Sequence, residues 1–313
     1  MHLLPMRRLR SWPWRLAVFP VLLGWCGGWG WAQEQGSPAV DAAAVVRRAV
    51  TNRRAEDAAH RPNRFLFHKQ DDRRNITQEI IETPQGDVAL LVAINGKALR
   101  PAGRQMERNR LDALDKDPEM QAHRLRREQS DAARVDNLLQ LLPDAFLYQY
   151  VDTVSCDVSA QPDVEAPGVS LRPIATRPPD SCYHMTFRPA PNWEPPNIEA
   201  KIFRGMAGEI WIDATDDRLV RLNAQLISDV DFGWGIVGRL DKGGSVFLEQ
   251  SKVGDHDWEL TRMKLNLTGK ALMVKPLSYH ITEELADFAP VPAGTDYHQA
   301  IRMLEAAQPA ARP

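Results

Sequence analysis

The stretch from Phe203 to Phe288 most constrains the fold, because it consists almost entirely of short runs suited to β-strands. The runs cover residues 209–213, 219–226, 245–253, 258–267 and 271–277, and turn signals stand between them at 216–217, 241–244, 254–257 and 269–270. Short runs cut by turns at intervals of about 8–12 residues predict an antiparallel meander. Sequential hairpins leave no room for crossover helices, so a doubly wound parallel sheet is not expected.

Several of these runs alternate between apolar and polar residues. Val220, Leu222, Ala224 and Leu226 fall on one side of their run, whereas Arg221, Asn223 and Gln225 fall on the other. Met263, Leu265 and Leu267 likewise oppose Arg262, Lys264 and Asn266. A period of two predicts strands with one apolar face and one wet face.

Several sequence segments of the same region resemble a known family. The residues in question are Gly208-Glu-Ile-Trp-Ile-Asp213, a strand near Arg221, the loop Phe232-Gly-Trp-Gly235, the run Val246-Phe-Leu-Glu-Gln250 and Trp258 at the start of a long strand. They look like the exported bacterial outer-membrane lipoprotein-sorting (LolA-like) proteins. The resemblance implies an α+β, mainly β fold, in which a curved antiparallel sheet or incomplete β-barrel is covered by helices. It also implies a hollow for acyl chains, and it transfers no functional residue.

The predicted apolar face supplies the candidate ligand-binding residues. They are Ile210, Ile212, Leu222, Leu226, Met263, Leu265 and Leu267. Two apolar segments can cover this face, a helix over 40–50 and a helix end over 138–146. Because two helix stripes leave part of so broad a face uncovered, we predict a slot for lipid or lipoprotein acyl chains, with envelope membrane proteins as further partners. The alternatives are an envelope structural or interaction protein with a filled interior, and a hydrolase with a dispersed site.

Residues 1–32 read as a cleaved export signal. Four arginines precede an apolar run from Leu16 to Trp25, and Gly30-Trp-Ala32 is a small-x-small cleavage site. The apolar run is shorter than the ~20 residues that span a bilayer, so no integral membrane segment is expected after cleavage. We therefore expect a periplasmic or secreted protein that begins near Gln33.

Charge and cysteine content agree with export. Loss of four arginines and no acidic residue would move the formal charge from 39 − 41 = −2 to 35 − 41 = −6. A mildly acidic chain has no global basic field for nucleic acid. The two remaining cysteines, Cys156 and Cys182, flank a proline-rich stretch, and in an oxidising compartment we expect them to form a disulfide. Two buried thiols are the alternative.

The rest of the chain supplies helices and further strands. A helix is predicted over 40–57 and strands at 65–68, 75–82, 88–94, 146–151 and 182–187, and Asn95-Gly96 is a strong hairpin signal. A helical insertion covers about 101–143 and divides at Asp117-Pro118. The charge-dense part from His123 to Arg134 is interpreted as a solvated helix face, although an anionic-lipid patch is an alternative. We predict a single domain over 33–296, then a short helix and a disordered tail over 297–313.

The sequence offers no catalytic, metal or cofactor signature. Gly233-Trp-Gly235-Ile-Val-Gly238 matches G-x-G-x-x-G, but a turn and a strand follow where a dinucleotide site needs a helix. Asp255-His256-Asp257 stands in a predicted turn, where aspartate is expected for backbone hydrogen bonds. The prediction is therefore a binding protein and not an enzyme, with no cofactor and no metal.

Overall fold

The computed structural model describes residues 40–57, 60–156, 164–169, 171, 173–174, 176–177, 179–232, 238–254, 257–272 and 275–306. Residues 40–313 form one compact unit, separate from residues 1–39. The predicted export signal, most of the loop at 233–238, residues 255–256 and the tail after 306 lie outside the described residues.

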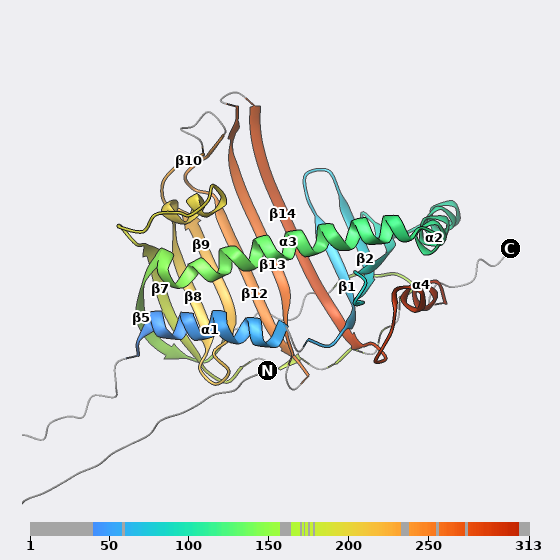
Figure 1. Cartoon of the computed structure of the whole chain (residues 1–313), viewed down its shortest axis with the longest axis horizontal. Helices are drawn as coiled ribbons and strands as arrows, with labels where there is room; N and C mark the ends of the chain where they lie inside the picture. Colours follow the sequence, from blue (N-terminus) through green and yellow to red (C-terminus); the bar gives the residue numbers. More distant parts are fainter. Residues whose placement is uncertain are drawn as a thin grey trace, which may run out of the picture. The chain divides into compact units, whose positions relative to one another are not determined.

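The centre of the compact unit is a broad antiparallel sheet (Figure 1). Its path runs β4-β3-β2-β1-β14-β13-β12-β9-β8-β7-β5, and the sheet is open, not closed into a barrel. The strands are β1 (Asn63–Gln70), β2 (Asn75–Ile81), β3 (Val88–Ile94), β4 (Lys97–Ala98), β5 (Phe146–Val154), β6 (Thr176–Arg177), β7 (Cys182–Pro189), β8 (Met206–Asp213), β9 (Leu219–Leu226), β10 (Val230–Phe232), β11 (Gly238–Leu240), β12 (Ser245–Val253), β13 (Asp257–Ala271) and β14 (Lys275–Pro290). The predicted α+β, mainly β class with a curved antiparallel sheet is confirmed.

Within the described residues, four α-helices and a 3-10 helix accompany the sheet. They are α1 (Ala42–Asp57), α2 (Pro101–Lys116), α3 (Pro118–Ala145), η1 (Glu199–Gly205) and α4 (Tyr297–Ala306). The predicted division at Asp117 is confirmed, because the Asp117 side chain caps α3 by accepting a hydrogen bond from the Met120 backbone N–H at 2.9 Å. Pro118 then occupies the first helical turn, where its missing N–H costs nothing.

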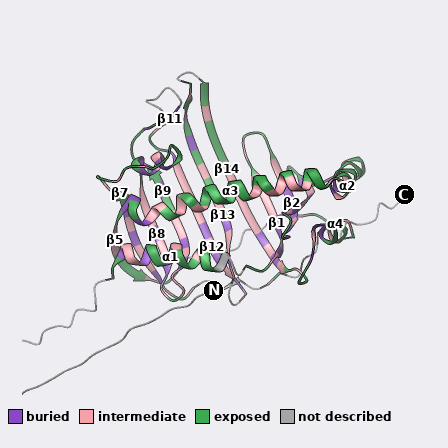
Figure 2. Cartoon of the chain, viewed as in Figure 1, coloured by how far each residue is buried: buried purple, intermediate pink, exposed green. Residues whose placement is uncertain are grey.

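The helices bury two separate parts of the sheet. Val45 and Val46 of α1, together with Phe203 of η1, pack on the strands from β5 to β13 in the main core. Leu111 and Leu114 of α2 pack with α4 against β2 and β3 at the other end. Figure 2 shows buried residues on the strands near α1 and again near α2 and α4. The strands between these two cores receive less cover.

Two predicted features of the meander need correction. The prediction of a turn at Gly269-Lys270 is wrong, because β13 continues to Ala271 and both residues pair with β11 and β14. A Cβ atom at Gly269 would lie 2.1 Å from the Arg239 carbonyl oxygen, so this glycine permits the close approach of β11.

Val220 does not belong with the other apolar residues of β9. The β8–β9 register shifts from Trp211↔Arg221 to Ile212↔Leu219, which leaves Val220 as the extra residue of a β-bulge. Val220 packs with Trp258 and the cysteines, whereas Leu219 packs against the main core.

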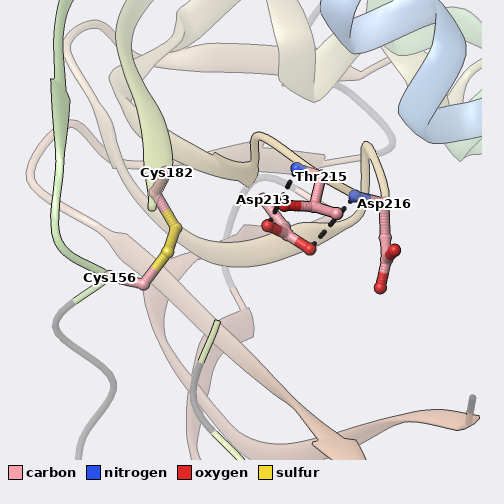
Figure 3. The surroundings of a disulfide bond; sticks show 5 residues. All are labelled: Cys156, Cys182, Asp213, Thr215 and Asp216. Atoms are coloured by element: carbon pink, nitrogen blue, oxygen red, sulfur yellow. Dashed lines mark hydrogen bonds between the residues drawn. A yellow bond between two sulfur atoms is a disulfide. The ribbon is translucent and has the colours of Figure 1, made fainter. Parts of the chain in front are cut away.

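Three local predictions hold. Asn95 and Gly96 have φ of 52° and 69°, and positive φ at both positions is what a type I′ hairpin between β3 and β4 requires. Cys156 and Cys182 form the predicted disulfide, with Cα atoms 5.2 Å apart (Figure 3). Beside it, the Asp213 carboxylate accepts hydrogen bonds from the Thr215 and Asp216 backbone N–H groups and holds the turn between β8 and β9.

Candidate functional site

The middle of α3 is exposed to solvent on every side. All seven residues from 129 to 135 are exposed, and seven residues make nearly two turns at 3.6 residues per turn. In Figure 1 this part of α3 passes in front of β13 and β14, between the two cores. Because the side of α3 that faces the sheet is also exposed there, the helix arches over the sheet without packing on it.

Both ends of the arch are fixed. Toward the C-terminus, Leu138, Leu141 and Leu142 pack against the main core. Toward the N-terminus, Glu128 accepts a hydrogen bond from the Asp87 backbone N–H at 3.1 Å, and Arg124 donates to the Asp87 carbonyl oxygen at 2.8 Å. Burial raises the pKa of the Asp87 carboxyl to about 7. The predicted solvated character of the charge-dense segment therefore holds for its second half, whereas its first half anchors the helix.

Val135 is the apolar residue at the centre of the arch. It is 51% exposed, yet it lies seven residues before Leu142 and three before Leu138. Residues spaced by three, four or seven share a helix face, so Val135 is on the face that α3 turns toward the sheet. We call the space between this part of α3 and the sheet the hollow, with Val135 in its roof.

The floor of the hollow is a double row of half-buried apolar side chains. One row is Leu222 (β9), Leu248 (β12) and Met263 (β13), and the other is Val246 (β12), Leu265 (β13) and Ile281 (β14). Members of a row are direct cross-strand partners and so point to the same face. Leu222, Val246 and Leu265 also contact the main core under the helices, which places the rows on the helix side of the sheet.

An ion pair bounds the first row. Met263 is paired with Glu283 on β14, and Glu283 with Lys69 on β1. Lys69 Nζ lies 2.5 Å from Glu283 Oε1, with both side chains less than a quarter exposed. The apolar floor therefore ends at β14 and is closed there by fixed charges.

A cavity of about 360 Å³ opens on one flank of the arch. Ala133, Arg134 and Leu138 of α3 and Glu199 of η1 are among the residues that line it. Its lining is mostly polar and includes no residue of the floor, so this cavity lies beside the hollow and does not measure it.

The predicted ligand-binding residues divide into two groups. Leu222, Met263 and Leu265 lie in the floor of the hollow. Ile210, Ile212, Leu226 and Leu267 are at most 6% exposed and belong to the main core. Sequence reasoning missed Val246, Leu248 and Ile281. Val246 and Leu248 stand in a continuous apolar run with Phe247, so the sequence does not show which of the three face the floor, and Ile281 lies beyond the predicted end of its strand.

The opposite face of the sheet carries a polar ladder instead of an apolar floor. Its members are successive cross-strand partners across nine strands: Asp152, His184, Trp211, Arg221, Glu249, Arg262, Glu284, His68 and Thr77. Glu249 at its centre is 1% exposed and accepts hydrogen bonds from Arg221 and Arg262. The His184 ring stacks on Trp211 at 4.7 Å, and the Arg221 guanidinium lies 5.8 Å from the same indole. The part of this face that the ladder crosses therefore offers no apolar floor to a ligand.

One cluster has the residue types of a hydrolase but not the arrangement. Ser278 Oγ and the Asp72 carboxylate both contact His280 Nδ1, at 3.0 Å and 3.1 Å, and they contact each other. A catalytic triad needs the serine and the carboxylate on different imidazole nitrogens, so that the histidine can pass a proton. This cluster is exposed, and we assign it no catalytic role. Within the described residues, no group of His, Cys, Asp and Glu side chains could hold a metal ion.

The histidine with the largest pKa shift lies at the start of β1, away from the hollow. A hydrogen bond from His60 Nε2 to Glu82, 2.9 Å long, raises the pKa of this histidine to about 9. Burial raises the pKa of nearby Glu259 to about 7, and the neighbouring Glu82 adds to the rise. This cluster joins β1, β2 and β13 and is a structural contact.

Comparison with known proteins does not assign this chain to a family, so its function is inferred from the geometry described above. No protein-family model matches the sequence, and no curated protein matches it at a significant level. Among the described helices, none has the length and apolar character needed to cross a membrane.

Proposed function

We propose that this protein is an exported carrier that holds acyl chains, of a lipid or of a lipid-modified partner, in the hollow beneath α3. The observation that carries the proposal is the unsupported middle of α3 above a half-buried apolar floor. A helix that packs on a sheet normally buries one stripe along its length. Here Val135 and the floor residues remain partly exposed, so both have apolar surface left to bury.

The gain from filling the hollow is substantial. Burial of a methylene group contributes about 0.8 kcal/mol, so eight methylenes would contribute roughly 6 kcal/mol before the costs of association. A hydrocarbon chain suits the floor better than a polar ligand because the two rows offer six apolar side chains and no hydrogen-bonding group before the Lys69–Glu283 pair.

The proposed location is the periplasm or another extracytoplasmic compartment. It rests on the predicted export signal and on the Cys156–Cys182 disulfide, since disulfides persist in oxidising compartments. The resemblance to LolA-like proteins agrees with this proposal and adds lipoproteins to the candidate partners.

A structural or interaction protein with a filled interior is the second candidate. The burial of Ile210, Ile212, Leu226 and Leu267 favours it, because the part of the sheet under α1 is already packed. The two candidates differ in what occupies the space between Val135 and the floor.

Titration with a fluorescent fatty acid tests the proposal. The wild type should bind the probe saturably, and Leu265→Glu should weaken binding at least tenfold by placing a carboxylate in the floor. Asn266→Glu is the matched control, because the exposed Asn266 is the next residue of β13 and points to the other face. Val135→Glu should also weaken binding while leaving stability unchanged, since Val135 is half-exposed.

Circular dichroism and urea denaturation establish that each variant is folded. Absence of saturable binding by the wild type would defeat the carrier proposal and favour the filled interior. Equal binding by folded Leu265→Glu and Asn266→Glu would place the lipid elsewhere. Mass spectrometry of an organic extract, from protein purified without detergent, would identify a resident lipid.

A further inference from the structure

A second, smaller pocket lies at the opposite end of the sheet from α1. It has a volume of about 220 Å³ and is bounded by β3, the start of α2 and a wall formed by residues 167–169. Most of its lining is apolar, and Leu91, Leu99 and Val169 are among the contributors. For comparison, a dry cavity of about 150 Å³ holds a benzene molecule, so this pocket has room for a single substituted ring.

One polar group in the pocket is a buried carboxylate with an unused oxygen. The Glu79 side chain is completely buried, and both Nε and Nη2 of Arg64 contact the same oxygen, Oε1. Oε2 has no hydrogen-bond partner among the described residues. Burial raises the pKa of this carboxyl, while Arg64 opposes the rise. A buried acceptor without a hydrogen bond is destabilising, and more so when it is charged.

The second polar group in the pocket is a hydrogen-bond donor, the Arg104 guanidinium. Arg104 donates through Nη1 to the Leu99 carbonyl oxygen at 2.8 Å, but its buried Nε has no partner within the described part of the chain. The pocket thus contains an apolar body, one unmet acceptor and one unmet donor. A hydroxyl group can satisfy both, because it donates one hydrogen bond and accepts others.

We propose that this pocket binds a small apolar molecule that carries a hydroxyl group, such as a phenol. The hydroxyl would donate to Glu79 Oε2 and accept from Arg104 Nε, and the ring would lie against Val169 and Leu90, the cross-strand partner of Glu79. Neither polar atom is exposed to solvent, so entry of the hydroxyl requires the wall at 167–169 to move. This site is separate from the hollow and does not depend on the carrier function.

The disulfide bears on the same site. The wall lies within the loop that Cys156 and Cys182 close, 26 residues apart in sequence. Val164 anchors this loop by packing with Leu66 and Ala286. A tethered wall loses little conformational freedom on binding, so reduction of the disulfide should weaken the affinity of the pocket.

Fluorine NMR with 4-fluorophenol and 4-fluorotoluene tests the proposal. The two probes have nearly the same shape, but only the phenol has the hydroxyl. The wild type should bind the phenol saturably and about tenfold more tightly, since one net hydrogen bond is worth about 1–1.5 kcal/mol. Nuclear Overhauser contacts from ring protons to the Leu90 and Val169 methyl groups would locate the probe in the pocket.

Two variants separate the contributions. Glu79→Gln should abolish the preference, because Arg64 would hold the amide oxygen and the hydroxyl would face two donors. Arg104→Met should reduce the preference for the phenol. Because Arg104 is only partly buried, this variant should fold, and it keeps the test decisive if Glu79→Gln does not fold.

The outcomes distinguish this site from the hollow. Saturating fatty acid should leave the bound phenol in place, and Leu265→Glu should bind it normally, whether or not the carrier proposal holds. Lack of saturable phenol binding would overturn the inference and assign the two unmet groups to ordered water. Equal affinity for both probes would overturn the roles of Glu79 and Arg104.

Discussion

The Glu249 carboxylate at the centre of the polar ladder provides the sharpest test of the fold. We predict that Glu249→Gln destabilises the protein by about 3–5 kcal/mol, the usual loss when one partner of a buried ion pair is removed. Glu249 is 1% exposed and accepts three hydrogen bonds, from Arg221 Nε at 3.2 Å, Arg221 Nη2 at 2.9 Å and Arg262 Nη1 at 3.2 Å. The variant leaves two guanidinium groups facing a neutral amide.

Urea denaturation followed by tryptophan fluorescence measures this loss. With a slope of about 2–3 kcal/mol per molar urea, the midpoint should fall by about 1–2 M. The matched control is Asp231→Asn, which removes the carboxylate of the exposed Arg239–Asp231 pair and should leave the urea midpoint nearly unchanged. Equal midpoint shifts in the two variants would refute the argument.

A second substitution separates charge from packing. Addition of Arg221→Met to Glu249→Gln should recover part of the lost stability, because it removes the cation left beside the neutral amide, whereas Arg262 still pairs with Glu284 at 3.1 Å. Further loss in the double variant would show that the contacts of Arg221 with Trp211 and Phe247 dominate instead.

Three further predictions concern other parts of the molecule. The pKa of His60 is raised to about 9 by Glu82, so this contact should stabilise the protein fully below about pH 6.5 and cease to do so as the pH rises through 9. The loss should be below about 1 kcal/mol because the pair is partly exposed. In His60→Gln, the urea midpoint should change less with pH over that range than it does in the wild type. Joint replacement of Cys156 and Cys182 by alanine should lower the free energy of unfolding by about 3 kcal/mol, and thiol labelling of the unreduced, denatured wild type should find neither cysteine reactive. Gly208→Val should abolish folding or shift the thermal midpoint down by several degrees, whereas no change would contradict the close approach of β9, where a carbonyl oxygen lies 2.0 Å from the Cβ position.

Local signals in the sequence were sufficient for much of the sheet. The bounds of β9 and β12 agree with the predicted runs because each alternates and each ends at a turn with Asp or Gly. The limits of α4 were predicted for the same kind of reason, an apolar stripe after a turn.

The long β13–β14 hairpin could not be read in the same way. Ser278, His280, Thr282 and Glu284 alternate with less polar residues, but they belong to the polar ladder or its extension and give no apolar run. The pairing of β1 with β14 joins residues more than 200 positions apart, and no local signal specifies it.

The candidate site was only partly predictable for a related reason. Val135 and Leu142 occupy equivalent positions on the apolar stripe of α3, yet one is half-exposed and the other is packed. The difference depends on how far the sheet lies from the helix at each point, which is a tertiary property. Sequence periodicity therefore identified the apolar face but could not separate Leu222, Met263 and Leu265 from the four buried members of the set.

The arch of α3 has a consequence for exchange kinetics. The residues of its two central turns are all exposed, and Arg134 and Asp131, 3.5 Å apart, form a weak ion pair between exposed side chains. Isolated helical turns are marginal in water, so these backbone amides should exchange hydrogen with solvent far faster than those of the packed end near Leu142. Fraying of this segment would leave the sheet and both cores intact, so in the proposed carrier the rate of ligand passage would be set independently of the global stability of the protein.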